Sequence, residues 1–191
     1  GTVDTASTTA EELSAMMVGR NVSFHVEKGP LKTGSEVLSV EHLTVASKVH
    51  KNNAVKDVSF KVRAGEIVCI AGIDGNGQTE LIHGLTGLDK ITGGSVTLCG
   101  ETITHASIRR RGRNMSHIPE DRHKHGLVLD FTLEQNLVLQ RYKEPQFQHG
   151  GFIRSDAVRA YADRLIEQFD VRSGQGAVTI ARSMSGGNQQ K

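Results

Sequence analysis

Hydrophobic and polar residues alternate along much of the first half of the chain, which is the pattern of β-strands. The alternation predicts strands at Val37–Val45, Val55–Val62 and Ser95–Cys99. A largely continuous apolar run at Glu66–Ala71 is instead typical of a parallel strand that is buried on both faces. A further strand is expected at Asn114–Ile118. All of the predicted strands therefore lie before residue 120.

Apolar residues recur at helical spacing in other parts of the chain. A helix is predicted to begin at Thr79, and two more are predicted at Thr132–Leu139 and Ser155–Phe169. Ser155 is the expected N-cap of the last helix. Its apolar face is formed by Val158, Ala162, Leu165 and Phe169. Strands, then a strand–loop–helix unit, then helices indicate an α/β core that carries a helical subdomain.

The N-terminal segment has a different character. Thr9 and Glu12 are spaced as a capping box, which predicts a helix that begins near residue 10. Asn21–Pro30 alternates and is predicted to be a strand, and the glycines and serines that follow resemble a linker. The main domain is therefore expected to start near Val37.

Composition and charge exclude several classes. Two cysteines in 191 residues cannot build a disulfide scaffold, and they favour a reducing compartment. The net charge of +2 is too small to indicate nucleic acid. The basic run Arg109–Arg113 has no interleaved aromatic residue, so it is interpreted as a solvated face and no nucleic-acid partner is predicted. Glycine is abundant, at 21 residues against 3 prolines, which indicates specific backbone turns.

A glycine-rich loop, residues 72–79, follows the apolar run directly. Its spacing is that of a P-loop, G-x-x-x-x-G-x-[ST], except that Gln78 stands where lysine is expected. Backbone amides and the start of the next helix would attract a phosphate, and the Thr79 hydroxyl would bind Mg²⁺. The residues expected to bind nucleotide are Gly72, Asp74, Gly75, Asn76, Gly77, Gln78, Thr79 and Glu80.

Of two other interpretations of this loop, one stays open and the other is disfavoured. It could be a glycine-rich turn without a ligand, since such motifs occur by chance. A dinucleotide site is disfavoured because Glu80 stands where its third glycine is required. Gln78 also removes one charge-assisted contact, which costs about 1.5–3 kcal/mol. Together with the negative charges of Asp74 and Glu80, this predicts weak ATP binding and little or no hydrolysis.

A second motif with phosphate-binding character lies near residue 190. Ser185, Gly186 and Gly187 can present a hydroxyl and backbone amides at the start of a helix. A serine-capped helix start without a ligand is the alternative interpretation. The motif gains meaning from its place, about 110 residues after a P-loop and behind a helical segment.

Taken together, these motifs resemble the nucleotide-binding domain of ATP-binding-cassette (ABC) transporters. Residues 184–191 are similar to the signature motif of simple-sugar and nucleoside importers. Residues 118–122 and 126–127 resemble the second cassette of their tandem-cassette ATPase subunits, and 72–81 its altered Walker A loop. Residues 15–20 are similar to the tail of the first cassette.

The resemblance implies an α/β, P-loop NTPase-like cassette core with an antiparallel β subdomain and a helical subdomain, incomplete at its C-terminal end. Residues 1–35 would be the tail of a preceding cassette and a linker, 36–126 the nucleotide-binding core, and 127–191 the helical subdomain. Glu120 occupies the Q-loop position, and the signature residues are Ser185, Gly186, Gly187, Asn188 and Gln189. An adenine-stacking aromatic is expected near Val49–His50, where none of the usual kind stands.

The resemblance also implies a mechanism and partners. Such cassettes pair head to tail, so this signature motif would complete the ATP site of the first cassette. The partners would be that cassette, membrane permease subunits and, indirectly, a solute-binding protein, at the cytoplasmic face of the membrane. The Walker B carboxylates and the switch histidine of the family are expected beyond Lys191, so no catalytic residue is assigned.

Two rivals belong to other classes. The chain could be a non-catalytic interaction module whose loop binds no nucleotide. A chromosome-maintenance ATPase head shares the signature motif, but it would carry coiled-coil arms, and no sustained heptads occur.

Overall fold

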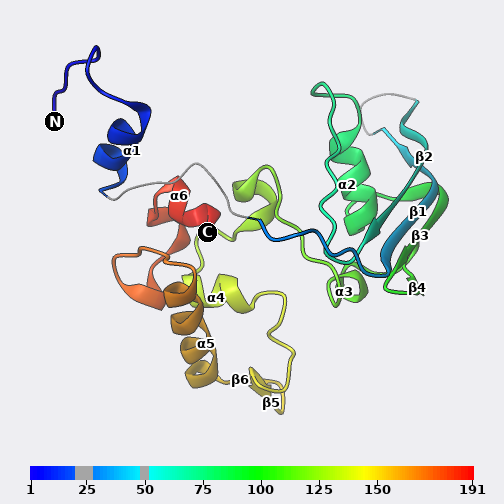
Figure 1. The fold of residues 1–191 in the computed structure, drawn as a ribbon. Helices are drawn as coiled ribbons and strands as arrows, with labels where there is room; N and C mark the ends of the chain where they lie inside the picture. The colour runs from blue at the N-terminus through cyan, green and yellow to red at the C-terminus, as the bar shows by residue number, and fades with distance from the viewer. Residues whose placement is uncertain (20–27, 48–51) are drawn as a thin grey trace.

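The computed structural model describes residues 1–19, 28–47 and 52–191. Within these, a sheet covered by one helix forms one packed region, and a group of helices forms another (Figure 1). The helices are α1 (Ala10–Val18), α2 (Gln78–Thr86), α3 (Ile108–Arg111), α4 (Leu133–Val138), α5 (Ser155–Gln168) and α6 (Gly186–Gln190), with a π-helical turn at Arg122–Gly126 and 3₁₀ turns at Gly176–Val178 and Ala181–Ser183. The strands are β1 (Glu36–Ala46), β2 (Asn53–Arg63), β3 (Ile91–Leu98), β4 (Glu101–Thr102), β5 (Gln148–His149) and β6 (Phe152–Ile153).

The larger sheet has the order β2-β1-β3-β4, and all its neighbouring strands are antiparallel. Helix α2 lies over this sheet, and Leu81 and Leu85 enter its core (Figure 1). The strands predicted at 37–45, 55–62 and 95–99 are confirmed, although β3 begins earlier, at Ile91. It ends at Leu98 because Cys99 and Gly100, with φ of 50° and 79°, form a tight turn to β4. The predicted antiparallel β subdomain is therefore present.

Two predicted strands are absent. Residues 66–71 and 114–118 have no strand assignment, and Ile67 is 89% exposed. A parallel strand needs hydrogen-bonding neighbours and cover on both faces. Met115 packs against the core of the sheet, but the other apolar residues of the two segments are exposed because no described strand is paired with either segment. The same reason makes Cys69 an exposed thiol.

The prediction that the basic run 109–113 is a solvated face is wrong for one of its residues. Arg109, Arg110 and Arg113 are exposed, as expected of a solvated face, but Arg111 is only 3% exposed. Its guanidinium donates to the carbonyls of Gly84, Leu85, Thr104 and Ala106. A buried charge of this kind is retained because each guanidinium nitrogen donates to at least one carbonyl oxygen. Arg111 therefore ties the end of α2 to the segment beside the sheet.

The helical region has a core of its own, built from Val138, Phe147 and Val158. Thr132 caps α4 in a capping box with Gln135, which confirms the helix predicted there. Helix α5 is also confirmed, but its N-cap is Arg154 rather than Ser155, which is the first helical residue. The expected apolar face is buried only in part, because Phe169 is 54% exposed.

At the N-terminus, α1 begins after Thr9, whose capping box with Glu12 is confirmed. Most of the strand predicted at 21–30 falls outside the described residues. None of the helices in the described part of the chain has both the length and the apolar character needed to cross a membrane.

Candidate nucleotide-binding sites

The glycine loop, residues 72–79, leads into the start of α2. Gly75 and Gly77 have φ of 83° and 96°, a region that side chains with a Cβ rarely adopt. A Cβ on Gly77 would also lie 2.6 Å from the Ala54 carbonyl oxygen of β2. No side chain caps the first turn of α2, so its first amides are not occupied by a capping group. The backbone of this loop therefore fits a phosphate group.

Gln78 occupies the inside of the same loop. Its Nε2 donates to the Ile73 carbonyl oxygen over 3.2 Å, and a Cβ on Gly72 would overlap this amide. The residue at the usual lysine position is thus turned back onto the loop and carries no charge. Asp74 is exposed and Glu80 half-buried, and both place carboxylates near the loop.

A hollow of about 720 Å³ lies beside the loop. From α2 it is lined by Gln78, Thr79, Ile82 and His83, and from the other side mainly by residues between His117 and His125. Thr79 and Glu120, which the sequence assigns to Mg²⁺ and to the Q-loop position, therefore line one hollow. A hydroxyl and a carboxylate are the hard oxygen ligands that suit Mg²⁺. The residues present fit MgATP, apart from the missing lysine.

The histidines of this hollow act on one another. His83 and His125 meet edge to face with 5.5 Å between ring centroids. Burial lowers the pKa of His117, and electrostatic repulsion by the neighbouring His83 and His125 lowers it further. His117 is consequently held toward its neutral form.

The signature motif, Ser185–Gln189, surrounds the start of α6. Ser185 is at the N-cap position, but its side chain makes no cap hydrogen bond, unlike a serine-capped helix start. Its Oγ instead accepts from Asn188 Nδ2 over 3.0 Å, and Asn188 Oδ1 accepts from the Arg172 amide over 2.9 Å. Asn188 therefore fixes the Ser185 hydroxyl. Ser185 and Asn188 line a different hollow, of about 530 Å³.

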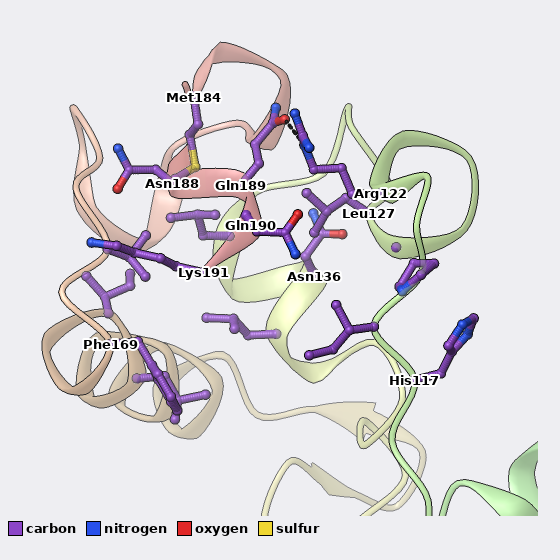
Figure 2. A pocket seen from close by; sticks show the side chains of 18 residues that line it. His117, Arg122, Leu127, Asn136, Phe169, Met184, Asn188, Gln189, Gln190 and Lys191 are labelled. Carbon is purple, nitrogen blue, oxygen red and sulfur yellow. Dashed lines mark hydrogen bonds between the residues drawn. The ribbon is translucent and has the colours of Figure 1, made fainter. Parts of the chain in front are cut away.

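The half-buried side chain of Gln189 points toward Arg122 (Figure 2). Its Oε1 accepts from Arg122 Nε over 3.3 Å and pairs with His123 Nε2 at 2.8 Å, while its Nε2 donates to the Ala181 carbonyl over 2.8 Å. The backbone of Gly187 is open, since a Cβ there would meet nothing within 4 Å. Sequence reasoning missed Arg122, because no spacing rule relates it to a residue 67 positions later.

The proposed adenine position near Val49–His50 lies outside the described residues.

Comparison with known proteins adds independent support. The family model "ABC transporter" matches residues 55–191. The chain is 44% identical to the guanosine import ATP-binding protein NupO of Bacillus subtilis (strain 168), over all of this chain and 37% of that protein. It is also 44% identical to the nucleoside import ATP-binding protein NupA of Lactococcus lactis subsp. cremoris (strain MG1363), with the same coverage. The chain thus spans little more than a third of the length of these relatives.

The fold has counterparts among solved structures. One described as an ATP binding subunit of an ABC transporter aligns with a TM-score of 0.59 at 22% identity, covering 81% of this chain and 58% of that chain.

Proposed function

Since the chain belongs to the ABC transporter family, we propose that it forms part of the second cassette in the ATP-binding subunit of a nucleoside or simple-sugar importer. We favour a nucleoside over a sugar as the transported solute, because the two relatives described above at 44% identity are named for guanosine and nucleoside import. In this proposal residues 1–35 are the tail of the first cassette and a linker, 36–126 the core and 127–191 the helical subdomain. The subunit would hydrolyse ATP at the cytoplasmic face of the membrane, together with permease subunits and a solute-binding protein.

The two candidate sites would have different tasks. The glycine loop would hold phosphates through backbone amides and Mg²⁺ through Thr79, with Glu120 on the other side of the hollow. Bound MgATP would supply the free energy of transport. Gln78 weakens this site, because its amide is hydrogen-bonded to Ile73 and gives no charge to the phosphates. We assign no catalytic residue within the chain.

The signature motif would act on ATP held by the first cassette. Asn188 directs the Ser185 hydroxyl, and the open backbone at Gly187 allows a phosphate to approach the amides at the start of α6. The single observation that carries the proposal is this contrast. In the signature motif, Asn188 donates to the Ser185 hydroxyl, whereas in the glycine loop the uncharged amide of Gln78 is turned onto the Ile73 carbonyl.

Steady-state ATPase assays on the full-length subunit test the assignment. Ser185→Arg should abolish activity by filling the signature side of the first cassette's site, whereas Gln78→Ala should leave most of it. Ser35→Arg, which adds the same group at an exposed position before β1, is the control. Equal losses from Ser185→Arg and Gln78→Ala would refute the division of tasks.

A calorimetric titration of the 191-residue chain with MgATP tests the glycine loop without the first cassette. We expect binding weaker than micromolar. Micromolar or tighter binding would contradict the role given to Gln78, and no detectable binding would favour the interaction module with a P-loop-like turn.

A further inference from the structure

Gln189 connects the signature motif to a turn that is far away in the sequence. Its side-chain oxygen accepts from Arg122, as Figure 2 shows, and also pairs with His123, while its side-chain amide donates to the Ala181 carbonyl. The Arg122 guanidinium also lies over the backbone of Gly186, where a Cβ would come within 2.8 Å of Nη2. Arg122 thus touches α6 at two residues, Gly186 and Gln189, which are three positions apart.

Arg122 is itself held by a short, capped turn. The Asp121 carboxylate accepts from the amides of His123 and Lys124, each over 3.0 Å, and the Lys124 contact is the main cause that lowers the pKa of Asp121. The turn closes where the Leu127 amide donates to the Arg122 carbonyl over 2.8 Å. Glu120 directly precedes the cap, so its backbone continues into the turn that carries Arg122.

We propose that Arg122 is a positioning residue for the signature motif, holding Gln189 from the segment that follows Glu120. Gln189 and Ser185 belong to the same helical turn, since the Gln189 amide donates to the Ser185 carbonyl over 3.0 Å. A shift of the 120–126 segment is therefore passed through Arg122 and Gln189 to the Ser185 hydroxyl and the amides of Gly186 and Gly187. This inference rests on the proposed function of the signature motif.

A double-mutant cycle on the full-length subunit tests it. Arg122→Met keeps the length of the side chain and removes its donors, and Gln189→Met removes the acceptor. Each single variant should lower kcat for MgATP by about fivefold, the scale of one half-exposed charge-assisted hydrogen bond, with little change in KM. In the Gln189→Met background, Arg122→Met should lower kcat much less than it does alone, because the Arg122–Gln189 contact is already lost.

The control separates positioning from general stability. Arg159→Met removes a different arginine contact, with the Glu134 carboxylate between α4 and α5, that does not reach the signature motif. It should leave kcat unchanged. Arg122→Lys should restore part of the activity. Additive losses in the cycle, equal losses in Arg159→Met, or a loss of kcat that follows a loss of thermal stability would each overturn the proposal.

The same set of variants separates this inference from the proposed function. If Ser185→Arg abolishes ATPase activity while the cycle is additive, only the role of Arg122 fails. If Ser185→Arg has no effect, the signature motif does not act on ATP and both fail.

Discussion

Arg111 offers the sharpest test of how the glycine-loop helix is held. Its guanidinium donates to the carbonyls of Leu85 and Thr104 over 2.7 and 2.8 Å, to Ala106 over 3.1 Å and to Gly84 over 3.4 Å. Gly84 and Leu85 belong to the last turn of α2, where carbonyls lack a partner within the helix. Arg111→Met fills similar space but leaves these acceptors without their donor.

The magnitude follows from the three shorter bonds. Each charge-assisted hydrogen bond contributes about 1.5–3 kcal/mol, which would exceed 4 kcal/mol for three. The cost of burying the guanidinium, which also lowers the pKa of Arg111, offsets part of this. We expect a net loss of about 3–5 kcal/mol, the range measured when one partner of a buried charged contact is removed.

Hydrogen exchange of the α2 amides measures this loss locally, without requiring that the whole protein unfold in one step. Since 1.4 kcal/mol corresponds to tenfold, exchange in α2 should accelerate roughly 10²- to 4 × 10³-fold. The control is Arg110→Met, because Arg110 pairs with Glu101 at the surface and such pairs contribute less than about 1 kcal/mol. If the two variants exchange at equal rates, buried carbonyl acceptors do not hold the end of α2.

Three further predictions concern the glycine loop and its hollow. Gln78→Lys should tighten MgATP binding by about tenfold to a hundredfold in calorimetry; unchanged affinity would count against charge as the cause of weak binding. Gly77→Ala should lower the melting temperature more than Gly75→Ala, because only the former adds a clash, with Ala54, to backbone strain; equal shifts would remove that clash from the explanation. Because the folded-state pKa of His117 is lowered, the unfolded chain binds more protons below about pH 6.5, so stability falls with acidification. His117→Gln should flatten this fall between pH 7.5 and 5.5 in thermal denaturation, and an identical slope would contradict it.

The local patterns of the sequence predicted those elements whose partners are nearby along the chain. β1 and β2 alternate, and the capping residues Thr9 and Thr132 stand at the helix starts. Residues 66–71 have an equally clear pattern, yet they form no strand, because a parallel strand depends on neighbours from distant segments. A hydrophobic pattern shows that a segment is able to form a strand, and the presence of a partner strand decides whether the strand forms.

The side-chain roles at the two sites were less predictable. The motifs place Gln78 and Gln189 correctly along the chain, but the spacing of a motif does not reveal which group each side chain contacts. Gln78 donates to Ile73, and Gln189 accepts from Arg122. Arg111 is the strongest example, because a basic run normally indicates a solvated face. Its burial follows from carbonyls up to 27 residues away, at the end of α2.

The glycine loop and the signature motif are held by different contacts. This explains how the glycine loop can lose affinity for nucleotide while the signature motif keeps its geometry. The glycine loop rests on β2 through Ala54, and its helix on Arg111. The signature motif is held through Asn188 and Gln189 by groups that lie after residue 120. A substitution such as lysine to glutamine at position 78 changes the charge of the first site without touching a contact of the second. Loss of affinity at the glycine loop is therefore compatible with a fully positioned signature motif.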